Sequence, residues 1–501
     1  MVGLPKKTCH SLLSHNQKLT QKNRMMSNKN KFYLGFSTLE QEIIIEQLPT
    51  QGTFPNWLKG SLFRNGAAKF EVGEQQYRHW FDGLAMLHKF SFNQGQVSYI
   101  NRFLQSETYC KTMEAVKICV SEFATAPSRS FWQGVGSLLS LEISDNANLN
   151  ITQIAGRLMA ITGTPYPVEF DPQSLRTIGK FYYTDKLPGL LTTGHPHRDL
   201  ENQELVNFLT QFSQSSTYNV YRLPFGQTQR RLIGSIPVDE PAYIHSFALT
   251  KNYVILAEPP LVTNPINLIT QNIKGKPFIE NFSWKPEKGS RFLVMRKDDG
   301  KMVRSYETLA FFALNQANAF ESEDEIIMDL PVYERPNIYD YYLHHLRNEE
   351  GCKLSKAEFR RYRIPLYGKS VTYELLSDQI IEFPQINIQK CHTKEYQFVY
   401  GVSLRQEHPN EFFNQLLKLD IFSQKTDRWF EDSCYPGEPI FVPNPNAERE
   451  DEGVILSVVL DGNKKNSFLL ILDGQSFAEI ARAELPHCIP FGTHGQYFPV
   501  L

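Results

Sequence analysis

Short apolar runs separated by turn residues recur along most of the chain. They are rich in β-branched, aromatic and leucine side chains, and each is roughly five to eight residues long, as expected of β-strands. Clear examples are 60–64, 96–100, 157–162, 253–257, 291–295, 325–330, 396–400, 453–459 and 466–472. Turn signals stand between or after such runs at Asp299-Gly300, Asp461-Gly462-Asn463 and Asp473-Gly474. The pattern predicts an all-β fold, either a sandwich, a barrel or a propeller.

The size of this strand-rich region narrows the choice of architecture. The chain has 501 residues, and no linker after Phe32 is long enough to separate two domains. Because closed all-β folds often form one large unit, we expect a single domain over residues 31–501, and its size favours a propeller. No WD or kelch repeat marks the blades. Helical patterns are few, and the clearest predicts a helix over residues 338–350.

The first 30 residues differ from the rest of the chain. They contain Lys and Arg but no Asp or Glu, and they are rich in Gln, Asn and Ser. A segment of this composition buries too little apolar surface to fold, so we expect residues 1–30 to form a disordered basic tail. A transit peptide is the alternative interpretation. The apolar core of a secretory signal is missing.

Composition and charge exclude several classes of protein. The net charge is -2, so the chain lacks the concentrated basic face that nucleic acids require. No stretch approaches the roughly 18 consecutive apolar residues of a membrane helix. The Cys count is 7, which is odd, and no two form a CxxC pair. This usage predicts free thiols in a reducing compartment, and therefore a cytoplasmic protein without disulfides or a zinc site.

Candidate chemistry lies in the histidines. Of the 13 in the chain, His195, His245 and His494 stand in distinctive settings next to Gly, Pro, Thr or Ser. A single such histidine is more often structural than a metal ligand. The three are far apart in sequence, so no helix or hairpin joins them, and a common site needs several strands to converge, as at a propeller axis. Spacing alone does not establish such a site.

Several ordered motifs carry a family resemblance across nearly the whole chain, from about residue 56 to residue 501. The histidine segments and the motifs at 64–66, 79–88, 318–321, 382–387 and 438–442 resemble those of the carotenoid cleavage oxygenases. The similarity is to the branch with the animal β-carotene oxygenases and the retinal pigment epithelium isomerohydrolase. The resemblance implies a seven-bladed β-propeller with a cap of helices and loops over an axial iron site.

The resemblance also implies roles for individual residues. His195, His245 and His494 match three of the family's four iron ligands, and the fourth position is Asn315; the neighbouring Gln316 restores no nitrogen ligand. Of the family's carboxylates that hydrogen-bond the ligand histidines, two match, at Glu382 and Glu438, whereas Gly163 replaces the third. His79, His88 and His197 lie in or beside the motifs and are expected to be structural or peripheral.

These departures leave three functions open. An amide oxygen is a harder and weaker iron(II) ligand than imidazole, although three histidines suffice for a divalent metal in other enzymes. The leading hypothesis is an Fe²⁺-dependent dioxygenase that uses O₂ to cleave a carbon–carbon double bond of a carotenoid or apocarotenoid. The alternatives are a carotenoid- or retinoid-binding pseudoenzyme with a degenerate metal site, and a non-oxidative retinoid isomerase. No separate catalytic acid or nucleophile is expected.

An apolar polyene substrate predicts a hydrophobic tunnel and contact with a membrane surface. Phe131, Val135 and Leu138 would fall on one face of a helix, although a core strand or turn is the alternative interpretation of the same residues. The resemblance favours a peripheral docking segment at 130–139. A second apolar patch spans 260–269. The basic tail would add attraction to anionic lipid.

Overall fold

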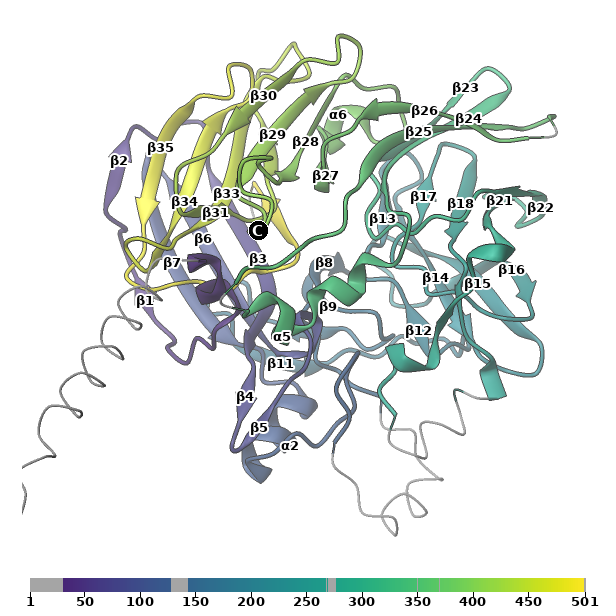
Figure 1. The fold of residues 1–501 in the computed structure, drawn as a ribbon, viewed down its shortest axis with the longest axis horizontal. Helices are drawn as coiled ribbons and strands as arrows, with labels where there is room; N and C mark the ends of the chain where they lie inside the picture. The colour runs from purple at the N-terminus through teal and green to yellow at the C-terminus, as the bar shows by residue number, and fades with distance from the viewer. Residues whose placement is uncertain are drawn as a thin grey trace, which may run out of the picture.

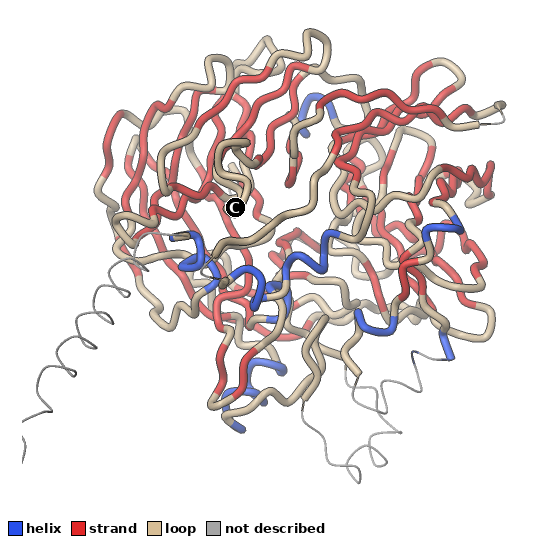
Figure 2. Tube along the Cα trace, in the orientation of Figure 1, coloured by secondary structure: helices blue, strands red, loops and turns tan. Residues whose placement is uncertain are grey.

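Antiparallel sheets arranged in a ring make up most of the protein in the computed structural model (Figures 1 and 2). The structure describes residues 30–127, 143–266, 268, 276–348, 350–368 and 370–499. The tail predicted at 1–30, except Asn30, and the docking segment predicted at 130–139 lie outside the described residues. Residues 267 and 269 of the second apolar patch also lie outside them.

Seven sheets of four or more strands, counted over the described residues, are the blades of a seven-bladed β-propeller. The first blade, in order across the sheet, is β1 (Ile44–Ile45), β7 (Gln96–Phe103), β6 (Leu84–Asn93), β3 (Gly60–Lys69) and β36 (Gly495–Phe498). The second is β11 (Thr177–Lys180), β10 (Val168–Phe170), β9 (Arg157–Ile161) and β8 (Asn150–Ile154). The third is β12 (Leu191–Thr192), β14 (Glu204–Gln211), β15 (Ser216–Pro224) and β16 (Arg231–Val238), with β13 (His197–Asp199) also on β14.

The remaining blades follow in chain order. The fourth is β17 (Ala248–Leu249), β18 (Tyr253–Glu258), β21 (Ser290–Arg296) and β22 (Met302–Thr308). The fifth is β23 (Asn318–Ser322), β24 (Glu325–Val332), β25 (Glu358–Pro365) and β26 (Thr372–Ser377). The sixth is β27 (Glu382–Gln385), β28 (Phe398–Ser403), β29 (Gln415–Asp420) and β30 (Thr426–Trp429). The seventh is β2 (Thr50–Gly52), β35 (Glu479–Glu484), β34 (Asn466–Asp473), β33 (Gly453–Asp461) and β31 (Cys434–Pro436), with β32 (Ile440–Pro443) also on β33.

The two ends of the chain close the ring. Strand β36, near the C-terminus, pairs with β3 in the first blade, while β2, near the N-terminus, pairs with β35 in the seventh. Purple and yellow strands therefore lie side by side in Figure 1. This exchange joins the first and last blades through backbone hydrogen bonds and leaves no gap between them.

The unbroken apolar runs seen in the sequence reflect burial on both faces of a blade. In β33, Ile455 and Val459 belong to one core cluster, whereas Val454 and Leu456, which point to the other face, belong to another. Each blade is packed between two neighbours, so both faces of its strands are apolar. The sequence shows continuous hydrophobic runs where a sheet with one wet face would show alternation.

Short helices and small sheets lie outside the seven blades. They are η1 (Lys31–Phe36), η2 (Trp80–Asp82), α2 (Glu107–Ala115), η4 (Ile279–Asn281), η5 (Pro286–Lys288), η6 (Asn337–Tyr341), α5 (Leu343–Leu346), α6 (Ile388–Cys391), the β4–β5 hairpin (Glu71–Val72 and Gln75–Gln76) and the β19–β20 pair (Leu261–Val262 and Ser283–Trp284). The helix predicted over 338–350 is wrong in its continuity. Tyr342 has extended backbone angles (φ -66, ψ 133) and separates η6 from α5, which ends at Leu346. An isolated bridge between Tyr342 and His79 replaces the helical pairing at this point.

Two expectations from composition can be compared with the structure. The cysteines of the described ranges are free thiols: Cys110, Cys119, Cys352, Cys391, Cys434 and Cys488. Within the same ranges, no helix combines the length and the apolar content that crossing a membrane requires.

Candidate metal centre

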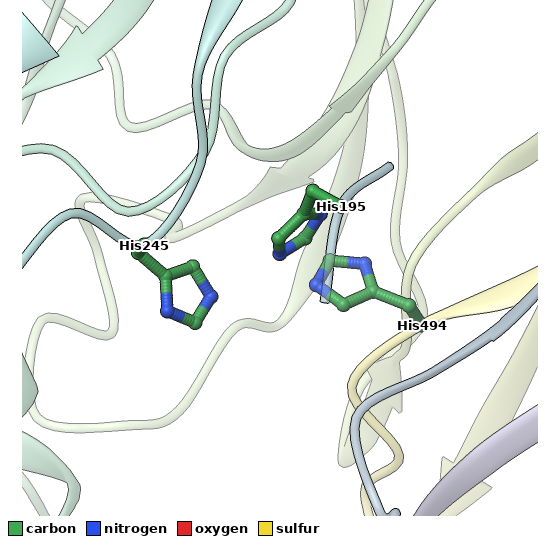
Figure 3. A group of neighbouring side chains, drawn as sticks. All are labelled: His195, His245 and His494. Atoms are coloured by element: carbon green, nitrogen blue, oxygen red, sulfur yellow. The ribbon is translucent and has the colours of Figure 1, made fainter. Parts of the chain in front are cut away.

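Three histidines from different parts of the ring meet near its axis (Figure 3). His195 lies on the loop between β12 and β13, His245 on the loop between β16 and β17, and His494 immediately before β36. Each offers a ring nitrogen, and these nitrogens lie within 4.8 Å of one another. The ring centroid of His195 is 5.0 Å from that of His245 and 4.6 Å from that of His494. The structure therefore brings together the three candidate ligands that the sequence separates.

Hydrogen bonds orient two of the three rings. His494 Nδ1 lies 2.8 Å from Glu438 Oε1, and His245 Nδ1 lies 3.0 Å from the Tyr243 hydroxyl. Because Nδ1 is engaged, each of these rings has Nε2 left for another partner. His195 Nε2 is buried without a hydrogen-bond partner. A buried nitrogen of this kind is costly unless an ion binds it, so the three residues fit a metal ion.

The protonation state of the rings suits metal binding. Burial lowers the pKa of His195 well below its usual value, and the neighbouring His494 and His245 lower it further. Burial, with a contribution from His494, lowers the pKa of His245 to about 3. Both rings are therefore neutral at physiological pH, which is the form that donates a lone pair to a metal.

Glu438 is the centre of a dense network behind His494. Its carboxylate forms an ion pair with the buried Arg64 and accepts hydrogen bonds from Gly495 N at 2.9 Å and Gln385 Nε2 at 3.0 Å. Burial alone would raise its pKa, but the charges of His494 and Arg64 hold the pKa of Glu438 below its usual value. The group behind His494 is thus an ionised carboxylate fixed on all sides.

Asn315, on the loop between β22 and β23, is held by Glu382 at the start of β27. Asn315 Nδ2 donates to Glu382 Oε2 at 2.8 Å, and the Tyr333 hydroxyl donates to Oε1 of the same carboxyl. Burial raises the pKa of Glu382, while the hydrogen bonds from Tyr333 and Asn315 oppose the rise. Asn315 is 6% exposed and Glu382 is 1% exposed. The residue at the family's fourth ligand position is thus hydrogen-bonded to one of the two matching carboxylates.

At the position of the family's third carboxylate this chain has Gly163, between β9 and β10, which has no side chain. A Cβ placed there would meet only Thr192 O, at 3.7 Å. The Tyr243 hydroxyl instead contacts Nδ1 of His245, two residues further along the same loop. Sequence reasoning missed Tyr243, because a hydroxyl two residues before a histidine is too common a pattern to indicate this contact.

Two cavities of different character adjoin the histidines. An apolar cavity of about 270 Å³ contains His245, Tyr243 and Gly163 in its wall. Its apolar lining includes Phe81, Phe123, Leu149, Leu191, Ile244 and Phe278. A second, more polar cavity of about 300 Å³ contains His195, His494 and Asn315 in its wall. The histidine cluster therefore lies between an apolar and a polar compartment.

Comparison with known proteins identifies the family. A family model described as retinal pigment epithelial membrane protein matches residues 36–499. The chain belongs to this family. Curated relatives include the mitochondrial carotenoid-cleaving dioxygenase of Mustela putorius furo, 33% identical over 93% of this chain and 96% of the relative, and the β,β-carotene 15,15′-dioxygenase of Mus musculus, 31% identical over 90% and 89%.

Solved structures of the family share the fold. An apocarotenoid oxygenase from Synechocystis (a Glu150Gln mutant) superimposes with a TM-score of 0.83 at 26% identity, covering 93% of this chain and 98% of the other. A cobalt-substituted form of that Synechocystis enzyme superimposes with a TM-score of 0.81. The resemblance found in the sequence and the seven-bladed propeller that it implies are thus confirmed.

Three other family-motif histidines lie outside the cluster. His79 Nε2 lies 2.8 Å from a backbone carbonyl oxygen, and His88 Nδ1 lies 2.8 Å from the Tyr99 hydroxyl. His197 Nε2 lies 2.7 Å from Phe247 O. Each of these rings is thus engaged by a group outside the histidine cluster, and their structural or peripheral role stays a prediction.

Proposed function

We propose that the protein is an iron(II)-dependent dioxygenase that cleaves a carbon–carbon double bond of a carotenoid or apocarotenoid. The observation that carries the proposal is the convergence of three imidazoles, His195, His245 and His494, with ligand nitrogens within 4.8 Å of one another. The names of its relatives, which are carotenoid-cleaving and apocarotenoid oxygenases, support the substrate class. Both oxygen atoms of O₂ would enter the two carbonyl products.

The protein's own residues would hold the metal and leave room beside it. His195, His245 and His494 would bind Fe²⁺, with the Glu438 carboxylate and the Tyr243 hydroxyl keeping two of the rings in position through Nδ1. When bound, the ferrous ion would supply the centre at which O₂ is activated. Three neutral protein ligands leave coordination positions open for this purpose.

The apolar cavity beside His245 would bind the polyene. Its aromatic and aliphatic walls exclude water and match a hydrocarbon chain. Glu122 also faces this cavity, and burial raises the pKa of its carboxyl well above the usual value. No acid or nucleophile is needed for the cleavage, and none is proposed.

The chemistry of the substrate also supports a cytoplasmic protein that docks peripherally on membranes. Carotenoids partition into bilayers, so an enzyme that consumes them has to collect them there. Free thiols in the described cysteines agree with a reducing compartment. Co-sedimentation of the full chain with phospholipid vesicles tests this association, and absence of binding to both neutral and anionic vesicles would contradict it.

Turnover under defined conditions tests the proposal. The purified full chain, loaded with Fe²⁺ and supplied with O₂, should convert β-carotene or a member of an apocarotenoid panel to aldehydes, detected by chromatography with mass spectrometry. The variant His245→Ala should give no product. Bound iron without product across the whole panel would overturn the proposal.

The alternative of a binding protein without turnover is favoured by Asn315 and Gly163, which depart from the family's site. It predicts a ligand-induced shift in carotenoid absorbance, little bound iron and no O₂ consumption. A non-oxidative retinoid isomerase would instead convert a retinyl ester without consuming O₂. An oxygen electrode and product analysis on the same samples therefore separate the three functions.

A further inference from the structure

We infer that the side-chain oxygen of Asn315 is a ligand of the metal, so that the protein offers three imidazole nitrogens and one amide oxygen. The inference rests on the metal site proposed above and specifies its fourth corner. Asn315 would then coordinate the metal in place of the family's fourth histidine, and the site would not be degenerate.

The hydrogen bonds of Glu382 determine which way the Asn315 amide faces. A carboxylate accepts hydrogen bonds, so the Asn315 atom that meets Glu382 Oε2 at 2.8 Å is the NH₂ group. The Tyr333 hydroxyl donates to the other carboxyl oxygen, and Phe383 N lies 3.3 Å from Oε2. Because the amide nitrogen and oxygen diverge from one carbon, Oδ1 is directed to a different side from the nitrogen that meets Glu382.

The surrounding contacts place Asn315 at the histidine cluster. Leu314 O, one residue earlier, accepts a hydrogen bond of 2.6 Å from Ser246 Oγ, and Ser246 directly follows His245. Asn315 also lines the polar cavity together with His195 and His494. The loop that carries Asn315 is therefore tied to the His245 loop and borders the space that the other two ligands border.

The strand that carries Glu382 contacts the cluster at His494. The ring of Phe383, the next residue, packs edge-on against His494 with centroids 5.2 Å apart. Asn315 thus lies between the His245 loop and the strand that contacts His494. Its amide is almost fully buried and borders the same cavity as His195 and His494.

The chemistry of this donor set is distinctive. An amide oxygen is neutral, so the total charge of the site equals that of a four-imidazole site, unlike a site with a ligand carboxylate. It is also a harder and weaker donor than imidazole, so the affinity for Fe²⁺ and Co²⁺ should be lower than a fourth histidine would give.

Cobalt binding to the full chain tests the inference. The Kd for Co²⁺, from competition with a chelator, and the visible ligand-field spectrum should be recorded for the wild type, Asn315→Ala, Asn315→His and Gln316→Ala. Gln316 is the matched control, because its side-chain oxygen is buried without a partner and lines the same cavity. Circular dichroism and thermal unfolding should show that each variant is folded.

We expect Asn315→Ala to weaken Co²⁺ binding on the order of 10–100-fold and to change the spectrum. Asn315→His should bind Co²⁺ at least as tightly as the wild type, with a different spectrum, and Gln316→Ala should match the wild type in both. Unchanged affinity and spectrum in Asn315→Ala, or the loss appearing in Gln316→Ala instead, would overturn the inference while leaving the dioxygenase proposal intact. Absence of Co²⁺ and Fe²⁺ binding in both the wild type and Asn315→His would overturn both.

Discussion

The rings of His494 and His245 each have a hydrogen-bond partner at Nδ1, but the two partners differ in kind. Behind His494, an ionised Glu438 is fixed by Arg64 and further donors. Behind His245, a single Tyr243 hydroxyl contacts Nδ1. Hydrogen bonds to ionised groups are roughly twice as strong as neutral ones, so the His494 ring is held more firmly.

The difference between the two hydrogen-bond partners matches the polarity of the cavities that they border. Glu438 borders the polar cavity, where a charge can be compensated, whereas Gly163 and Tyr243 border the apolar one. A carboxylate at residue 163 would place a charge against the apolar wall of the cavity beside His245, at a considerable desolvation cost. The His245 corner thus has a weaker hydrogen bond to its ligand and a less polar cavity beside it.

The largest effect is expected from Glu438→Gln. This change leaves Arg64 as a buried charge without its partner, so the free energy of unfolding should fall by about 3–5 kcal/mol, and metal affinity should also fall. Urea denaturation and chelator competition measure the two quantities. In the double variant Arg64→Met/Glu438→Gln, stability should recover but metal affinity should not; recovery of both would mean that Glu438 acts only on stability.

Metal removal should have the next largest effect. At a free metal concentration 100 times Kd, binding stabilises the folded state by about 2.7 kcal/mol, which a chelator should abolish. If the corners differ as described, amide hydrogen exchange should increase more at residues 243–247 than at 493–496 when the metal is removed. Equal increases in the two segments would contradict the comparison.

A smaller effect is expected from Tyr243→Phe, which removes the hydroxyl from His245 and keeps the ring. Metal affinity should fall about 10-fold, and the free energy of unfolding by about 1 kcal/mol. The same chelator competition applies. Tyr396→Phe, which removes a buried hydroxyl from Asp329, is the matched control for a buried phenol away from the site. An unchanged Kd in Tyr243→Phe would show that His245 needs no partner.

The smallest effect is expected from Gly163→Glu, which restores a carboxylate where the backbone has room for a side chain. Metal affinity should rise by a few-fold, since a stronger acceptor can reach His245, while cleavage of long substrates should slow because the apolar cavity is narrowed. The variant Gly163→Gln adds a side chain of similar size without the charge, so comparison with Gly163→Glu shows which property causes each effect. Faster cleavage together with tighter metal binding would contradict the idea that a carboxylate at residue 163 holds His245 better but narrows the cavity for the substrate.

Much of the fold was readable from local pattern. The runs at 60–64, 253–257 and 453–459 all became strands, since an apolar β-rich segment between turn residues has few other stable states. The predicted helix over 338–350 failed because Tyr342 is extended and bridges to His79, a contact between distant residues that local propensity does not record.

The sequence by itself determined the all-β architecture, the family and the identity of the candidate ligands, because strand composition and ordered motifs are properties of short segments. Only the tertiary structure decided that His195, His245 and His494 share one point, that Tyr243 supports His245, and that the amide of Asn315 turns its nitrogen to Glu382. His494 meets His195 and His245 because the ring closes, which brings together residues 299 and 249 positions apart. The contacts of Tyr243 and Asn315 depend on how loops and strands pack around the cluster. No local pattern encodes the direction in which a buried side chain then points.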